Sequence, residues 1–202
     1  MKLYYAKGAC SLAVRILINE IGIKSDFIAV DLQTKQTENK QDYLKINPKG
    51  AVPALETDKG ELLTENAVVQ QYLADTSNAQ KLLPAVGDFQ RYRVLEMLNF
   101  VGSDLHKSCG PLFNPNVPDQ IKKEIFIPNI KKLLTYLDKR LDGKSFLVGD
   151  HFTLPDAYLF VILRWMPHLN VDLGEFSQLK RYQAELAKRP SVKKSVEQEN
   201  LP

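Results

Sequence analysis

Residues 46–55 read INPKGAVPAL, and this stretch decides how the first part of the chain is interpreted. Proline lacks an N–H donor and fixes its own φ, so a segment containing Pro48, Gly50 and Pro53 cannot lie in the middle of a helix. The residues after Pro53 suit a strand that turns at Asp58-Lys59-Gly60 and returns as a second strand. A proline does least harm at the start of a strand. On spacing alone, an ordinary loop between sheet and helix is the simplest interpretation.

The flanking residues extend this segment into a ββα unit and place a βαβ unit before it. Ser11 is expected to cap the first helix, and Gly22 to end it in the left-handed conformation. A parallel strand pair joined by a helix, together with an antiparallel hairpin, gives a mixed sheet. We predict strands over residues 3–5, 27–30, 54–57 and 61–63, and helices over 12–21 and 64–73.

The second half of the chain has a helical pattern throughout. Apolar residues recur at helical spacing, and Thr153-Leu154-Pro155-Asp156 is a capping box that opens a strongly apolar helix. Pro111, Pro115 and Pro118 are expected to break the chain, and Pro128 to kink the following helix. The predicted helices lie near residues 89–105, 130–141, 153–165 and 176–186. We therefore predict an α/β domain over residues 1–78, a linker over 79–87 and an all-helical domain over 88–202.

Composition narrows the classes of function. The 202 residues carry 27 Lys and Arg against 24 Asp and Glu, interspersed along the chain, which argues against nucleic acid as the main partner. No apolar run approaches membrane-spanning length, and the first residues are too short for a signal segment. Cys10 and Cys109 are far apart, so we expect two free thiols and a cytoplasmic protein. Three scattered histidines give no metal-ligand spacing, and His151 and His168 are assigned structural roles.

Three groups of residues carry a family resemblance. They are NPKGAVPAL with Thr64-Glu65, the run Tyr4-Tyr5 to Gly8-Ala9-Cys10-Ser11-Leu12, and Asn99, His106 and Lys107 with the 153–156 box. Together they resemble the glutathione S-transferases, and Cys10-Ser11 at the end of the first strand resembles the bacterial beta class in particular. The resemblance covers the whole chain, and it implies a thioredoxin-like α/β domain followed by an all-α domain that carries the second-substrate pocket.

Cys10 is placed where negative charge on sulfur could be stabilised, directly before a helix. Lowering a thiol pKa by two units needs roughly 2.7 kcal/mol. A helix N-terminus supplies about 0.3–1 kcal/mol, and up to ~2 when partly buried, so a charge-assisted hydrogen bond must supply the rest. Ser11, a backbone N–H of the turn or His106 could donate that bond. A buried cysteine beside a capping serine is the alternative interpretation.

The resemblance assigns roles to the residues around the sulfur. It implies that Cys10 faces the glutathione sulfur and can form a mixed disulfide with it, and that Ser11 hydrogen-bonds the thiolate. His106 and Lys107 would line the wall between the thiol and the second-substrate pocket. From helix spacing alone, the face that carries His106 is an ordinary solvent-exposed face.

The resemblance also implies a set of residues that bind the rest of glutathione. Lys35 would pair with the glycyl carboxylate, although a solvated surface lysine is the commoner fate. The backbone of Val52 would pair with the cysteinyl portion beside a cis-Pro53, although X-Pro bonds are usually trans. Glu65 would accept the γ-glutamyl ammonium, and Asn66 would bind its carboxylate at the start of a helix. Serine or glycine is more usual at position 66.

The resemblance also implies a homodimer. Asn99 and Asp104 resemble residues that a partner subunit presents to the γ-glutamyl end, although glutamate is more usual at position 104. The expected function is a bacterial detoxification enzyme that conjugates glutathione, its co-substrate, to hydrophobic electrophiles. Thiol–disulfide exchange or reductive dehalogenation through Cys10 is a close variant. A non-catalytic interaction protein of the stringent-starvation type and a carrier of apolar ligands remain alternatives. No metal, other cofactor, nucleic acid or membrane partner is expected.

Overall fold

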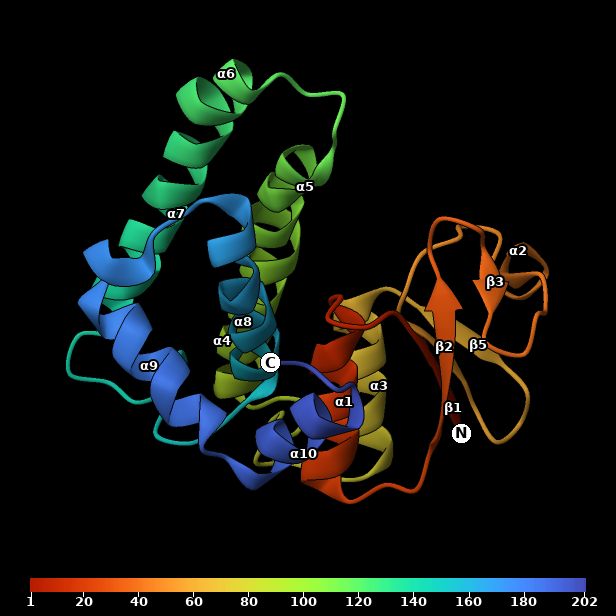
Figure 1. Cartoon of the computed structure of the whole chain (residues 1–202). Helices are drawn as coiled ribbons and strands as arrows, with labels where there is room; N and C mark the ends of the chain where they lie inside the picture. The colour runs from red at the N-terminus through yellow and green to blue at the C-terminus, as the bar shows by residue number, and fades with distance from the viewer. The chain divides into compact units, whose positions relative to one another are not determined.

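The computed structural model describes residues 1–202, which pack as two compact units. One unit comprises Met1–Leu83 with Arg189–Pro202, and the other comprises Pro84–Lys188. The fold class is confirmed, because the first unit contains a thioredoxin-like sheet with helices and the second contains helices alone (Figure 1). Packing places residues 189–202 with the N-terminal residues, whereas the predicted division assigned them to the helical domain.

A five-stranded mixed sheet forms the centre of the first unit. β1 pairs in parallel with β2 and antiparallel with β4, so it lies in the middle of the order β3-β2-β1-β4-β5. The antiparallel hairpin predicted after Pro53 is present, while the short outer strand β3 was not predicted. The strands are β1 (Lys2–Tyr5), β2 (Asp26–Asp31), β3 (Gln36–Thr37), β4 (Ala54–Glu56) and β5 (Leu62–Thr64).

Helices pack against both faces of the sheet at β1, because neighbouring residues of a strand point to opposite sides. Leu3 packs with apolar residues of α1 and α3, whereas Tyr4 packs with Tyr43 of α2 on the other side. Figure 1 shows α1 and α3 side by side, with α10 against α1. Gly22 ends α1 at φ +82°, as predicted. The helices of this unit are α1 (Ser11–Ile21), α2 (Tyr43–Ile46), α3 (Asn66–Thr76) and α10 (Pro190–Gln198).

The second unit is built around α8, in which every residue from Leu154 to Leu163 is buried. The capping box predicted at Thr153 and Asp156 is present at its start. This helix packs against α4, η1 and α9, and α7 packs against α9 and α5. The elements are α4 (Phe89–Asn99), η1 (Phe100–His106), α5 (Lys107–Phe113), α6 (Asp119–Ile121), η2 (Lys122–Phe126), α7 (Ile127–Arg140), α8 (Leu154–Trp165), η3 (Pro167–Leu169), η4 (Leu173–Glu175) and α9 (Ser177–Ala187).

Pro115 and Pro118 lie in the predicted break of the chain, whereas Pro111 and Pro128 act differently from the prediction. Pro111 lies inside α5 and does not end it, so the break comes later, between Phe113 and Asp119. Pro128 lies in the first turn of α7, where a missing N–H is tolerated, and the irregular segment is the π-helical η2 before it. A second π-helical segment, η1, interrupts the run from α4 to α5. Pro190 starts α10, a helix that the sequence pattern did not reveal.

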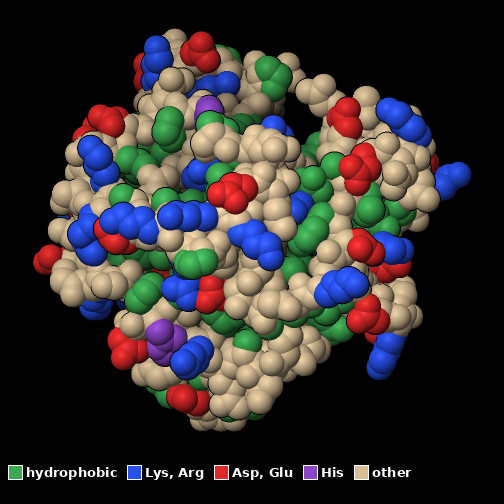
Figure 2. Space-filling view, turned by 60° about the horizontal axis from the view of Figure 1, so that its bottom comes forward, with side chains coloured by type: hydrophobic (Ala, Val, Ile, Leu, Met, Phe, Trp, Pro, Cys, Tyr) green, Lys and Arg blue, Asp and Glu red, His purple; other side chains and the backbone are tan.

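The surface is mixed in charge. In the space-filling view, basic and acidic side chains both occur across the visible face, with hydrophobic atoms between them (Figure 2). None of the helices is both long enough and apolar enough to cross a bilayer.

Candidate functional site

Three segments of the first unit meet at Cys10, which is 8% exposed. The end of β1 leads through a tight turn to Cys10, which occupies the N-cap position of α1. Its Sγ donates to the carbonyl oxygen of Val52 at 3.3 Å, and its own carbonyl accepts from Asn66 Nδ2 at 2.7 Å. The Val52-Pro53 peptide bond is cis, as the family resemblance implied. The structure therefore brings together Cys10, Val52, Pro53 and Asn66.

The protonation state of Cys10 differs from the expected thiolate. Burial raises the pKa of the Cys10 thiol to about 11, and the nearby Glu65 charge adds to this. Hydrogen bonds from Asn66 and from backbone N–H groups lower the pKa but do not outweigh burial. Cys10 is therefore a neutral thiol at pH 7. The cost of burial was missing from the sequence-based argument, which counted only the stabilising contributions.

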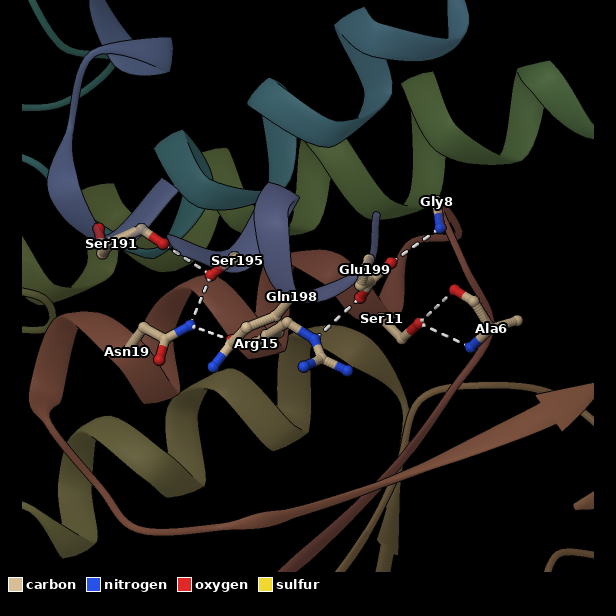
Figure 3. Close-up of polar contacts among 9 residues, drawn as sticks. All are labelled: Ala6, Gly8, Ser11, Arg15, Asn19, Ser191, Ser195, Gln198 and Glu199. Carbon is tan, nitrogen blue, oxygen red and sulfur yellow. Dashed lines mark hydrogen bonds and ion pairs between the residues drawn. The ribbon is translucent and has the colours of Figure 1, made fainter. Parts of the chain in front are cut away.

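The Ser11 hydroxyl is bonded to the backbone of Ala6. Ser11 is fully buried, and its hydroxyl accepts from the Ala6 N–H at 3.2 Å and donates to the Ala6 carbonyl at 3.3 Å (Figure 3). The prediction that Ser11 caps α1 is wrong, because the N-cap residue is Cys10 and no side chain caps this end. Its role at a glutathione thiolate stays a prediction.

Residues near the C-terminus form hydrogen bonds with the turn before Cys10 and with α1. The Glu199 carboxylate accepts from the Gly8 N–H at 2.8 Å and from Arg15 Nε at 3.0 Å (Figure 3). Further along α1, Asn19 donates to Ser195 and Gln198, both in α10. Residues on both sides of Cys10 are thus tied to the end of the chain.

Charged side chains lie on the segments that flank Val52. Lys35 is half-buried and its Nζ donates to the Gly50 carbonyl at 2.9 Å. Glu65 has a φ of +70°, uncommon for a residue with a side chain, and its carboxylate pairs with Lys49 Nζ at 2.5 Å. Both side chains of that pair are more than half exposed, so the pair adds little stability and its partners remain accessible.

Asn66 begins α3 with its side chain directed inward. Its Nδ2 bonds to Cys10, and its Oδ1 accepts from Gln70 Nε2 at 2.5 Å. The side chain is thus held by Cys10 and Gln70, and its contact with the γ-glutamyl carboxylate stays a prediction. Sequence reasoning missed Lys49 and Gln70. The i, i+4 spacing of Asn66 and Gln70 was the available signal.

The predicted residues of the second unit form two clusters on one helical run. Asn99 and Asp104 are exposed and share Ser103, whose hydroxyl bonds to Asn99 and to the Asp104 carboxylate. Lys107 is also exposed.

The second cluster surrounds His106. Its Nδ1 lies 2.5 Å from the Tyr158 hydroxyl, and its ring packs edge-on against Trp165. Burial lowers the pKa of His106 to about 4, and the Lys107 charge contributes, so the imidazole is neutral at pH 7. His151 and His168 are exposed, and His151 pairs with Asp150. No three His, Cys, Asp or Glu side chains are grouped to hold a metal ion.

Comparison with known proteins decides the family. The family models described as glutathione S-transferase N-terminal and C-terminal domains match residues 1–75 and 88–190. The chain is 39% identical to glutathione S-transferase GstA of Escherichia coli O157:H7 over 201 residues, covering 100% of both. This chain belongs to the glutathione S-transferase family.

Solved structures agree with this assignment. The transferase superimposes on a ternary complex of BphK, a bacterial GST, with a TM-score of 0.96 at 40% identity over 100% of both chains. A beta-class transferase of Sphingomonas chungbukensis gives the same three values. A sphingomonad transferase complexed with glutathione gives a TM-score of 0.95 at 40% identity, again over both whole chains. The expected bacterial beta-class resemblance, the transferase activity and glutathione as co-substrate are therefore confirmed.

The geometry explains which part of the reaction each group can support. Cys10 and the start of α1 offer a thiol proton and backbone N–H groups to a bound sulfur. The Val52 backbone lies next to Cys10 at the cis peptide bond to Pro53, where a peptide could pair with it, and Glu65 offers an exposed anion. These three features would suit the thiol, the peptide groups and the ammonium group of glutathione, respectively.

Proposed function

We propose that this transferase conjugates reduced glutathione to hydrophobic electrophiles, with glutathione held along the Cys10–Val52–Glu65 side of the first unit. The observation that carries the proposal is the convergence of Cys10, Val52 and Asn66, with Glu65 directly before Asn66. Glutathione would pair its cysteinyl peptide with the Val52 backbone and place its ammonium on Glu65. Lys35 would bind the glycyl carboxylate. This set of thiol-handling residues disfavours a purely non-catalytic interaction protein or ligand carrier.

The chemical step that we propose is stabilisation of a glutathione thiolate held close to the electrophile. Because Cys10 is protonated at pH 7, it would donate its S–H to the bound sulfur and would not compete as a nucleophile. The helix N-terminus adds favourable dipoles that are oriented before the reaction starts. Holding both reactants together removes part of the entropic barrier. His106, neutral at pH 7, would act as a hydrogen-bonding wall residue of the second-substrate pocket, with Lys107 beside it.

A slower redox reaction at Cys10 is the proposed secondary activity. The small thiolate fraction of Cys10 would attack one sulfur of glutathione disulfide, forming a Cys10–glutathione disulfide and releasing glutathione thiolate, which takes up a proton. Replacing Cys10 with alanine is expected to leave glutathione binding intact and to abolish this adduct. Intact mass measurement after incubation with glutathione disulfide checks the result. An adduct that persists in the variant and maps to Cys109 would contradict the choice of Cys10.

Glu65 provides the most direct test of the binding mode. Glu65→Gln removes the charge that would accept the γ-glutamyl ammonium and keeps the size of the side chain. Loss of one charge-assisted hydrogen bond, about 1.5–3 kcal/mol, is expected to weaken glutathione binding about 10- to 100-fold in calorimetry. Glu61→Gln, four residues earlier and exposed, is the matched control, and Lys49→Met separates the effect of the Lys49 ion pair. Equal affinities for Glu65→Gln and wild type would refute this binding mode, and absence of binding by wild type would refute the function.

We further propose that the transferase is a cytoplasmic homodimer in which Asn99 and Asp104 of one subunit face the γ-glutamyl group bound to the other. Their exposure and their shared Ser103 support this, because the cluster leaves polar groups available to a ligand or a partner. Two free cysteines suit a reducing compartment. Elution as a monomer at micromolar concentration would contradict the dimer.

A further inference from the structure

A chain of buried amides connects α3 to the turn that carries the sulfur. Gln70 Nε2 donates to Asn66 Oδ1 at 2.5 Å, and Asn66 Nδ2 donates to the Cys10 carbonyl at 2.7 Å. Gln70 is fully buried and Asn66 is 7% exposed. A carbonyl oxygen only accepts hydrogen bonds, so the NH₂ group of Asn66 must face Cys10 and its oxygen must face Gln70. The directions of both hydrogen bonds, from Gln70 to Asn66 and from Asn66 to Cys10, are therefore fixed.

We propose that Asn66, oriented by Gln70, is a positioning residue that holds the Cys10 peptide and stabilises negative charge on the sulfur at this turn. The proposal rests on the proposed function, because it assigns the stabilising side chain for the thiol chemistry described there. It assigns to Asn66 a role that sequence reasoning gave to Ser11.

Two observations support this role besides the hydrogen-bond distances. The Ser11 hydroxyl is bonded to Ala6 and no side chain caps α1, whereas Asn66 donates to the carbonyl oxygen of Cys10. The Asn66 NH₂ group has a second N–H, and hydrogen bonding from the Asn66 side chain is the largest of the effects that lower the pKa of Cys10 against burial.

Gln70 joins this pair of hydrogen bonds through its NH₂ group only. Its Oε1 is buried and has no hydrogen-bond partner. Replacing Gln70 with leucine removes this unpaired oxygen and leaves Asn66 Oδ1 unpaired in its place. Overall stability is therefore expected to change little, while Asn66 loses the contact that orients it. A change in Cys10 reactivity without a change in stability would therefore distinguish a positioning role from a purely structural one.

The test measures Cys10 reactivity in the free protein, with Cys109→Ala as the background. The variants are Gln70→Leu and Asn66→Asp, which matches the size of asparagine but has no N–H to donate. The control is Gln71→Leu, because the Gln71 amide bonds to Ala67 within its own helix. Iodoacetamide alkylation of Cys10 is followed from pH 7 to pH 11, together with kcat and KM for glutathione and thermal unfolding.

We expect both variants to raise the pKa of Cys10 by about one unit, which slows alkylation at pH 8 about tenfold. We also expect kcat to fall more than KM rises, and Gln71→Leu to match the background in every readout. An unchanged alkylation profile in a folded Gln70→Leu protein would overturn the proposal, whatever the melting temperature. Calorimetry with glutathione on the background protein tests the proposed function separately, since alkylation needs no glutathione.

Discussion

Replacing Glu199 with alanine is expected to lower the free energy of unfolding by about 3–5 kcal/mol, because it leaves a buried cation without its anion. The Arg15 side chain is 2% exposed and that of Glu199 is 0% exposed. The Arg15 guanidinium lies between the Tyr5 and Phe27 rings, 4.2 and 3.8 Å from their centroids, and one of its NH₂ groups already lacks a partner. Without Glu199 the arginine would have no anion, and the Gly8 N–H would lose its acceptor.

Urea unfolding followed by circular dichroism measures this change, and hydrogen exchange in α1 and α10 shows where it occurs. The control is Glu185→Ala, which breaks an exposed pair with Lys188 and is expected to cost less than about 1 kcal/mol. The double variant Arg15→Met/Glu199→Leu is expected to recover much of the loss, because apolar residues can replace a buried ion pair. If Glu199→Ala and Glu185→Ala cost the same, the buried pair does not stabilise this unit.

Replacing Asp156 with alanine is expected to cost the second unit a similar amount, about 3–5 kcal/mol. The Asp156 carboxylate is fully buried and accepts four hydrogen bonds: from the Leu147 N–H, the Tyr182 hydroxyl, and the N–H and hydroxyl of Thr153. Alanine would leave these donors buried without an acceptor, and α8 would lose its capping box.

Thermal and urea unfolding of Asp156→Ala check this expectation. Asp150→Ala is the matched control, because the Asp150 side chain is 98% exposed and pairs only with the neighbouring His151. A loss below about 1 kcal/mol for Asp156→Ala would show that water or a rearranged loop replaces the carboxylate.

Local chemistry made much of the first unit predictable. The alternation of short apolar runs with Gly22 and with the Asp58–Gly60 turn predicted the βαβ and ββα units. In the second unit, the capping box at Thr153 and Asp156 was equally predictable, because it depends on residues three positions apart. The two-residue strand β3 gave too little pattern to recognise.

The candidate site was predicted less completely, because its details depend on contacts between distant segments. Position left Ser11, a backbone N–H and His106 open as donors to the sulfur, and the family resemblance favoured Ser11. In the structure the Ser11 hydroxyl bonds to the Ala6 backbone, and Asn66 donates to the Cys10 carbonyl. The high pKa of Cys10 comes from burial, which no local pattern reveals. The π-helical segments have the same apolar spacing as ordinary helix, so the sequence could not distinguish them.

The pairing of Arg15 with Glu199 joins residues 184 positions apart, and this affects how the protein is made. At about 5–20 residues per second, a ribosome needs roughly 10–40 s between the two. During that interval the nascent N-terminal unit carries an arginine whose acidic partner has not yet been translated. Translation of the segment that carries Glu199, and not emergence of the sheet, is therefore the event that completes this unit, and a stop codon before position 199 would leave it unfinished.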